Sequence, residues 1–289
     1  MSAVEPSHTS LDSVCCHVQG AEKSKLASYF EDKVEEITAS RLHTLEGNEE
    51  DKKNQVKLEV YHDICQKLAP SNVLSKYMME RIPSTERLFQ FRRTFASQLA
   101  ANSLLQYALS IVERTPNRFL FCDTTGQILS QDFRSQYTLP NGLLDNLDMP
   151  FRMTRNITEF IGPFLLEGVF VPSFANVSSA LHSSRNVLEH ILYLLLRDEV
   201  MAWYISKSSN KSDQKIQEVE NKLIEKIWSN VQFVQGRFDE CSPREVKDAA
   251  AEAIEPSPTP IDIKVRTLVD ASMSAEKLCM MPPSYEAWL

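Results

Sequence analysis

The stretch RFLFCDTTGQILSQDFR, residues 118–134, decides the fold of this chain. Two β-prone runs, FLFC at 119–122 and QILSQ at 127–131, flank the polar tetrapeptide DTTG at 123–126. Two such runs separated by a tetrapeptide that ends in glycine predict a β-hairpin. Because an isolated two-stranded hairpin is at best marginally stable in water, we expect the segments on both sides to pack against it.

Helical periodicity dominates the rest of the chain and predicts a mainly α (α+β) fold with one small hairpin. The longest helical pattern runs from residue 85 to about residue 112, with Ser84 able to cap its start and Pro116 closing it. Shorter helices are expected at residues 26–37, 56–68 and 73–81, and again from about residue 172.

Three later segments differ in how their apolar residues are distributed. A short helix after Asn156 should break at Gly162-Pro163. Residues 186–205 are apolar nearly all round and should therefore be buried, whereas residues 217–238 carry a single apolar face. The proline-rich run at 256–260 predicts a stiff connector without secondary structure.

Length and composition indicate a soluble globular protein with one main core, and 289 residues are enough to build it. The net charge of −8 argues against sequence-independent nucleic-acid binding, which needs a basic surface. Six scattered cysteines predict free thiols in the cytosol or nucleus. His182 and His190 lack partners at metal-ligand spacing, so neither a metal nor a cofactor is expected. No apolar run reaches membrane-spanning length.

Several longer motifs resemble the C-terminal part of the phosphatidylinositol 3-kinase-related kinases, and in particular the TRRAP family. They are FRRTF at 91–95, DTTG at 123–126, PFRMT at 150–154, NITEF at 156–160, LRDEVMAW at 196–203 and the tail at 278–289. The resemblance implies a protein-kinase-like C-lobe at 26–205 and, at 261–289, a helical FATC segment, which is the short C-terminal motif of this family. We expect a disordered tail at 1–25, and an amphipathic helix with the proline-rich connector at 206–260.

The positions that align with the family's catalytic residues depart from its pattern. An active member carries Asp-Arg-His-x-x-Asn before the hairpin and Asp-Phe-Gly or Asp-Leu-Gly after it. A gapless alignment from Asp132 places Glu113 at the catalytic base, Thr115 at the histidine, Arg118 at the metal-binding asparagine and Arg134 at the glycine. A misplaced base costs on the order of 100-fold in rate. A guanidinium about 4 Å from a magnesium site repels it by roughly 4 kcal/mol per unit charge at an effective dielectric near 20.

The remaining kinase features are also absent from this sequence. A one-residue gap would place Asn117 at the metal position but restores neither the aspartate nor the histidine. The seven glycines form no GxGxxG or Walker pattern, so we expect the phosphate-covering N-lobe to be missing and catalysis to be lost. Asp132 is then interpreted as a turn-capping acid, and Arg152 as a loop anchor paired with a buried acid. Glu113 and Arg114 are interpreted as solvent-accessible charges at a helix end.

The end of the chain is rich in large apolar residues. Five of them fall in the last 12 residues: Leu278, Met280, Met281, Tyr285 and Trp288. A free terminus frays unless such groups dock, and burying a leucine or methionine contributes roughly 1.5–3 kcal/mol. We therefore expect Leu278, Met281, Tyr285 and Trp288 to dock this segment onto the kinase-like lobe, as the resemblance also implies.

The resemblance implies a nuclear pseudokinase scaffold that has no enzymatic activity. Such a protein holds together SAGA-type histone acetyltransferase coactivator complexes on chromatin, and binds their subunits and transcription activators, without direct nucleic-acid or membrane contact. One alternative is a fragment of an active serine/threonine protein or lipid kinase of the same family, with its N-lobe on further sequence. A second alternative is a helical adaptor unrelated to kinases, which predicts that no hairpin forms at 119–131.

Overall fold

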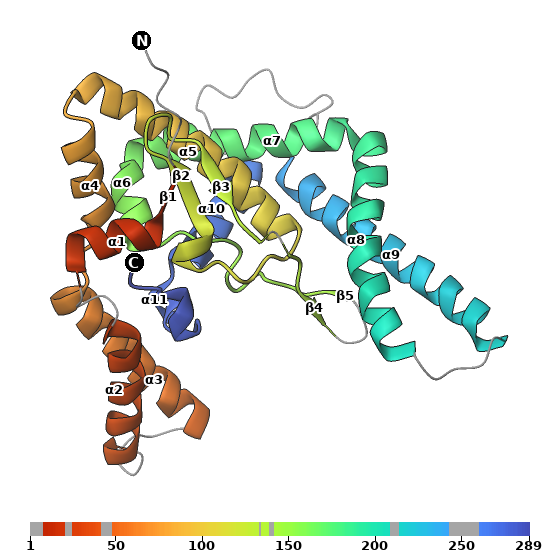
Figure 1. Cartoon of the computed structure of the whole chain (residues 1–289), viewed down its shortest axis with the longest axis horizontal. Coiled ribbons are helices and arrows are strands. Elements are labelled where there is room, and N and C mark those ends of the chain that lie inside the picture. The colour runs from red at the N-terminus through yellow and green to blue at the C-terminus, as the bar shows by residue number, and fades with distance from the viewer. Residues whose placement is uncertain are drawn as a thin grey trace.

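The computed structural model describes residues 8–20, 25–41, 48–132, 134–138, 142–208, 214–242 and 260–289. Figure 1 shows a central body built around a small sheet, with α2 and α3 projecting at one end and α8 and α9 at the other. The predicted mainly α (α+β) fold is confirmed. The proline-rich connector expected at 256–260 lies outside the described residues.

The elements follow one another along the chain in a largely helical order. The helices are α1 (Leu11–Gln19), α2 (Leu26–Arg41), α3 (Glu49–Asp63), α4 (Val73–Arg81), α5 (Thr85–Ala108), α6 (Arg155–Leu165), α7 (Val171–Ser183), α8 (Arg185–Ser208), α9 (Gln214–Cys241), α10 (Pro260–Met273) and α11 (Ala275–Leu278). The strands are β1 (His8–Ser10), β2 (Phe119–Cys122), β3 (Ile128–Ser130), β4 (Tyr137–Thr138) and β5 (Gly142–Leu143). Short π-helical turns follow α3 (Ile64–Leu68) and α6 (Leu166–Phe170), and single 3-10 turns precede β2 (Pro116–Arg118) and follow α11 (Pro283–Tyr285).

The predicted hairpin forms between β2 and β3, which run antiparallel with Leu120 opposite Leu129. A third strand, β1, pairs antiparallel with the other edge of β2 and places Thr9 opposite Phe121. The adaptor alternative required this hairpin to be absent, so that alternative is wrong.

The disordered tail expected at 1–25 is wrong for the part of it that the structure describes. β1 and α1 are ordered there, and Leu11, Val14 and Cys15 are fully buried, with α1 packed against α4. The edge of β2 offers unpaired main-chain groups, and β1 satisfies them. This order depends on partners that are distant in the sequence (β1 with β2, α1 with α4), which a local pattern does not reveal.

The centre of the core lies on one face of α5. Phe91 and Phe95 pack edge-to-face on Phe121 of β2 and Phe160 of α6, with ring centroids between 5.2 and 6.5 Å apart. α5 begins at the predicted cap, where the main-chain N–H of residue 87 donates to Ser84 Oγ. It ends four residues before the predicted boundary at 112, because the chain turns into a left-handed conformation shortly after Ala108.

The predicted break at Gly162-Pro163 is confirmed, since Gly162 adopts φ 68° and ψ 168° inside α6. Among the described residues, one helical run, Arg155–Ser183, is long and apolar enough to cross a membrane by length and composition alone. The kink interrupts this run, and Phe160, Phe170 and Phe174 are buried within the chain. Part of this run therefore packs inside the chain, whereas Phe164 within it is 92% exposed.

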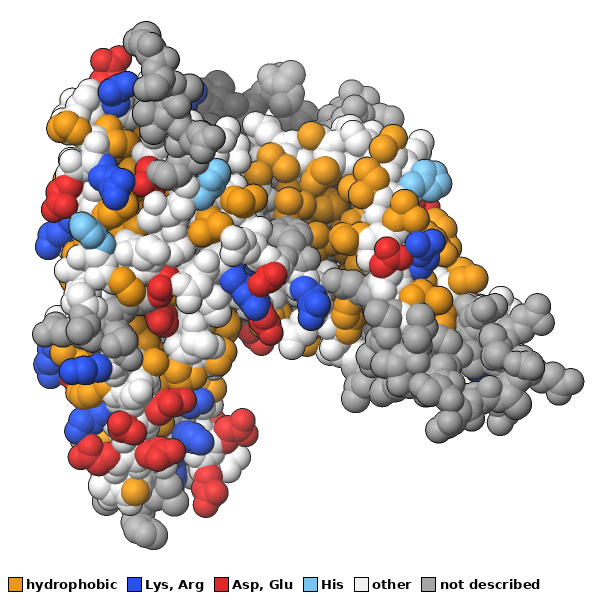
Figure 2. All heavy atoms as spheres, in the orientation of Figure 1, with side chains coloured by type: hydrophobic (Ala, Val, Ile, Leu, Met, Phe, Trp, Pro, Cys, Tyr) orange, Lys and Arg blue, Asp and Glu red, His pale blue; other side chains and the backbone are white. Residues whose placement is uncertain are grey.

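α8 is less buried than the sequence predicted for residues 186–205. Leu192, Leu196 and Val200 are buried, whereas four apolar side chains of the same helix are exposed: Val187, Ile191, Leu194 and Leu195. α8 packs chiefly on α9, and the two helices project together from the body, with apolar side chains visible along α8 (Figures 1 and 2). A helix with one main neighbour can bury only one side.

Gly126 should be difficult to replace, because the hairpin turn approaches α5 closely. Gly126 has φ 75°, and an added Cβ would lie 2.8 Å from the carbonyl oxygen of Phe91 and 3.3 Å from the nitrogen of Phe95. We expect Gly126→Ala to lower the free energy of unfolding by about 1–3 kcal/mol, measured by chemical denaturation. Gly168→Ala is the matched control, because no atom lies within 4 Å of its added Cβ. Equal stability of the two variants would contradict this packing.

Candidate functional site

The residues aligned with catalytic positions come together beside the hairpin. Glu113, Thr115 and Arg118 precede or begin β2, and Asp132 follows β3. Because β2 and β3 are antiparallel, the start of one strand lies next to the end of the other, and the N–H of Gln131 donates to the carbonyl of Arg118 at 3.0 Å. Glu113, Thr115 and Arg118 line one small cavity.

Arg118 occupies the space between the two acids of this site. Its guanidinium forms ion pairs with Glu113 through Nη1 and with Asp132 through Nε, the latter at 3.2 Å. Both carboxylates are mostly exposed, at 74% for Glu113 and 67% for Asp132, so each pair contributes only about 0–1 kcal/mol to stability. Arg118 therefore places a positive charge between the two carboxylates.

Asp132 also marks a local turn in the main chain. It adopts φ 53°, a left-handed conformation that aspartate tolerates better than most residues, and its carbonyl accepts from the N–H of Arg134 at 2.8 Å. The sequence predicted a turn-capping acid at Asp132; the turn contact is made by its main-chain carbonyl, while its side chain pairs with Arg118.

The cavity beside these residues is very small. Its volume is about 10 Å³, and Gln106, Arg114 and Arg152 complete its lining together with the residues above. Ligand pockets usually measure roughly 300–1,000 Å³, whereas this volume suits about one water molecule. The described residues contain no group of three or more His, Cys, Asp or Glu that could hold a metal ion. A nucleotide does not fit in this space.

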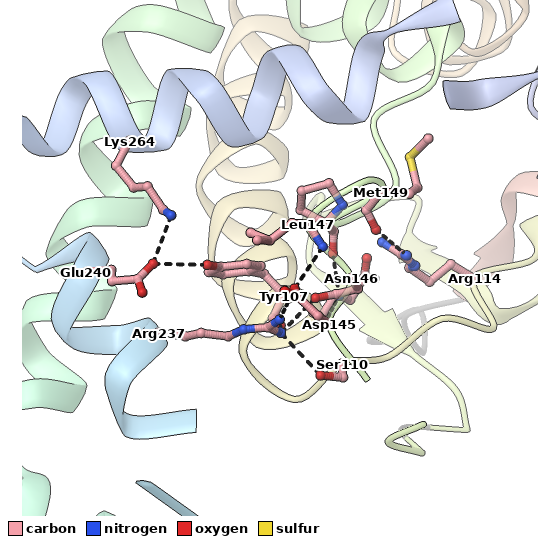
Figure 3. Close-up of polar contacts among 12 residues, drawn as sticks. Tyr107, Ser110, Arg114, Asp145, Asn146, Leu147, Met149, Arg237, Glu240 and Lys264 are labelled. Atoms are coloured by element: carbon pink, nitrogen blue, oxygen red, sulfur yellow. Dashed lines mark hydrogen bonds and ion pairs between the residues drawn. The ribbon is translucent and has the colours of Figure 1, made fainter. Parts of the chain in front are cut away.

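Arg114 is buried, so its interpretation as a solvent-accessible charge is wrong. The side chain is 4% exposed, and its Nη2 donates to the carbonyl of Met149 at 2.6 Å (Figure 3). Its Nε donates to the carbonyl of Val112 at 3.4 Å. The pKa of Arg114 is lowered to about 10, chiefly by burial; Tyr285 offsets part of this shift, and the neighbouring charge of Arg152 adds to it. The loss of hydration on burial is therefore the largest cause of the lowered pKa of Arg114.

Arg152 joins the loop after the hairpin to the C-terminal segment. Its Nη1 donates to the carbonyls of Arg114 at 2.9 Å and of Tyr285 at 2.6 Å, and its Nη2 donates to the carbonyl of Glu286 at 3.3 Å. Its guanidinium also lies over the Tyr285 ring, 4.6 Å from the centroid. The predicted anchor is present, but its hydrogen bonds go to main-chain carbonyls and not to a buried acid.

This arrangement gives both terminal nitrogens of the Arg152 guanidinium main-chain acceptors. Burial lowers the pKa of Arg152, and the nearby Glu286 carboxylate offsets part of that shift. Carbonyl dipoles from two distant segments supply the acceptors, and each of those carbonyls needs a donor once it leaves water.

The C-terminal segment packs against two separate parts of the chain. Leu278, Tyr285 and Trp288 are each 2% exposed, whereas Met281 is only partly buried. The Trp288 ring contacts Phe30 of α2 with centroids 5.6 Å apart. The segment therefore covers the junction between α2 and the loop that carries Arg152.

Sequence reasoning missed Arg237 of α9, which is 4% exposed. Figure 3 shows its guanidinium among residues of the loop between β5 and α6 and of the end of α5. It donates to the carbonyl of Tyr107, to Asn146 Oδ1 at 2.7 Å, to Asp145 Oδ1 at 2.9 Å and to Ser110 Oγ at 3.2 Å. α9 thereby holds the loop that leads to Arg152.

A signal for this network was present in the sequence. Arg237 lies three residues after Val234 and one before Phe238, on the apolar face of a helix, where a charged residue must find buried acceptors. Glu240 extends the network by accepting from the Tyr107 hydroxyl at 3.3 Å and pairing with Lys264 of α10 at 2.8 Å (Figure 3).

His182 and His190 do not belong to this site. His182 Nδ1 lies 2.6 Å from Asp239 Oδ1 near the surface, where the histidine side chain is 47% exposed. His190 lies on the exposed side of α8.

Comparisons with known proteins agree with the predicted kinase-like fold. The family model for phosphatidylinositol 3- and 4-kinase matches residues 6–205. The transformation/transcription domain-associated protein of Danio rerio is 26% identical over 256 residues, which is 86% of this chain and 6% of that protein. The SAGA complex/NuA4 acetyltransferase complex subunit TRA1 of Saccharomyces cerevisiae is 30% identical over 167 residues, which is 52% of this chain and 4% of that protein.

A kinase is also among the relatives. The serine/threonine-protein kinase ATM of Drosophila melanogaster is 23% identical over 235 residues, which is 81% of this chain and 8% of that protein. This chain therefore spans less than a tenth of the length of these relatives. The solved structure of the FAT and kinase domain of CtTel1 matches 99% of this chain and 18% of its own, with a TM-score of 0.58 at 16% identity, and confirms the predicted kinase-like fold.

Removing residues 285–289 should destabilise the fold, because Tyr285, Trp288 and Leu289 would leave the core. Each buried side chain of this size contributes roughly 1.5–3 kcal/mol, so we expect a clear fall in melting temperature and yield.

The Arg152→Met variant should lose stability as well. Because both changes break the same contacts, their effects should be less than additive in a double-mutant cycle. Met280→Ala, at an exposed position, is the control, and an unchanged melting temperature after truncation would contradict docking.

Proposed function

We propose that this chain, which belongs to the phosphatidylinositol 3- and 4-kinase family, acts as a non-catalytic scaffold. The observation that carries this role is the position of Arg118 between Glu113 and Asp132. Phosphoryl transfer depends on metal ions that neutralise the phosphate charge and on exact positioning of the base. Here Arg118 forms ion pairs with the two acids that would act as the base and as the metal ligand.

The small cavity supports the same conclusion from geometry. At about 10 Å³ this cavity cannot hold a nucleotide, and its lining includes three arginines: Arg114, Arg118 and Arg152. Those cations would repel a divalent metal ion at close range. Charge and size thus both favour a structural role for this part of the chain.

The names of the relatives support a particular setting for the scaffold. One is a subunit of the SAGA and NuA4 acetyltransferase complexes, and another is a transformation/transcription domain-associated protein. We infer that this chain works in the nucleus within a histone acetyltransferase coactivator complex on chromatin, and that it contacts protein subunits and transcription activators. Residues 261–289 then serve as a FATC segment, docked through Leu278, Tyr285 and Trp288.

The alternative is a fragment of an active serine/threonine protein or lipid kinase. Two observations favour it: Asp132 is retained after the hairpin, and the Drosophila melanogaster ATM kinase is a relative. In that case Arg118 would have to leave both carboxylates before magnesium could bind, so this alternative requires a rearrangement of the site.

Titration of the purified full chain with magnesium-ATP separates the two functions. We expect no saturable, metal-dependent binding by calorimetry, because Arg118 occupies the metal position. Saturable binding that needs magnesium, and that disappears in Asp132→Asn but not in Asp198→Asn, would replace the scaffold with the kinase alternative. Asp198 is a matched control because it is an exposed acid that also pairs with an arginine.

Affinity purification tests the assembly itself. A tagged full chain, expressed in its source cells and recovered from nuclear extract, should retain subunits of an acetyltransferase complex identifiable by mass spectrometry. The variant that lacks residues 285–289 and the tag alone serve as controls for fold-dependent recovery. If the intact chain recovers only what the tag recovers, the scaffold assignment fails, whatever the result with ATP.

A further inference from the structure

Two buried arginines beside the small cavity each leave one N–H group without an acceptor. Arg114 is 4% exposed and Arg152 is 1% exposed, and both line the cavity. Nη1 of Arg114 and Nε of Arg152 are buried and make no hydrogen bond, although the other side-chain nitrogens of both residues donate to main-chain carbonyls. Buried donors without a partner are rare in folded proteins, so each one needs an explanation.

The charges around this cavity do not balance. Arg118 is paired with Glu113 and Asp132, so its charge is already met. Among the described residues, neither Arg114 nor Arg152 has a carboxylate oxygen within ion-pair distance. The Glu286 carboxylate lies near enough to influence Arg152, and it can offset one of the two charges. The guanidinium of Arg114 then has main-chain carbonyls as its hydrogen-bond acceptors, and burying a cation without an acidic partner is costly in a low-dielectric interior.

The cavity sets a strict limit on what could supply the missing negative charge. A volume of about 10 Å³ suits one water molecule or one monoatomic ion, and it excludes a nucleotide. Glu113 also lines the cavity, but its carboxylate is 74% exposed and pairs with Arg118. A water molecule could accept the two N–H groups yet would leave the net charge unchanged.

We propose that this cavity is a binding site for a single monovalent, monoatomic anion of the size of chloride, held by the unpartnered N–H groups of Arg114 and Arg152. The anion reduces the electrostatic repulsion between the two guanidinium groups. It also strengthens the connection to the C-terminal segment, because Arg152 donates hydrogen bonds to the carbonyls of Tyr285 and Glu286. This site does not depend on the scaffold role.

The first test compares the thermal stability of the full chain in sodium chloride and in sodium gluconate at equal ionic strength. We expect the melting temperature to rise with chloride in a saturable manner, and bromide to replace chloride, whereas gluconate is too large to enter. Arg114→Met should weaken the apparent chloride affinity by roughly tenfold or more, because it removes both a charge and a donor. Arg185→Met, at an exposed arginine that pairs with Asp239, should keep the full response.

Crystals of the unaltered full chain grown in sodium bromide give a direct readout that does not depend on the stability of any variant. We expect an anomalous peak at the bromine absorption edge between the guanidinium groups of Arg114 and Arg152. Equal melting temperatures in chloride and gluconate, or density at this position without anomalous signal, would overturn the anion site and identify the occupant as water. A chloride response that persists unchanged in Arg114→Met would also overturn it.

Discussion

The hydrogen bonds from Arg152 to main-chain carbonyls are the constraint on which the rest of this structure depends. A buried guanidinium must place its N–H groups on acceptors, and here the acceptors come from Arg114, ahead of the hairpin, and from Tyr285 and Glu286 near the end of the chain. The segment before the hairpin, the loop after it and the C-terminal segment are therefore fixed to one another by a single side chain. Aromatic packing of Trp288 on α2 then extends this joint to the N-terminal helices.

Arginines hold the irregular parts of this fold in the same way. Arg114 donates to Met149, and Arg237 donates to Tyr107 and to the side chains of Asp145 and Asn146. The loop between β5 and α6 has no regular ladder of its own, so its buried carbonyls and amides must find donors and acceptors elsewhere. Guanidinium groups are suited to this because each offers several donors in a fixed plane. The concentration of cations near the hairpin follows from that structural need, and it is unfavourable for a metal ion.

The position of Arg118 is the observation on which the proposed scaffold role rests. The hairpin, α5 and the kinked α6 reproduce the frame of a kinase-like lobe, and the acids at 113 and 132 still lie beside the hairpin. Both acids form ion pairs with Arg118. A scaffold needs the frame alone, whereas a phosphotransferase also needs those acids free, so this one side chain favours the first function.

The sequence by itself determined the features that depend on neighbouring residues. The turn glycine at 126 fixed the hairpin, Ser84 fixed the start of α5, and Gly162 fixed the break in α6, because each acts through its own backbone conformation or local hydrogen bonds. The alignment around Asp132 selected Glu113 and Arg118, and in the structure Arg118 pairs with both Glu113 and Asp132. Only the tertiary structure decided the order of β1 and α1, the exposed side of α8, the burial of Arg114 and the contacts of Arg237. These depend on partners far along the chain, and a periodic pattern shows that a face is apolar or charged without showing what, if anything, covers it.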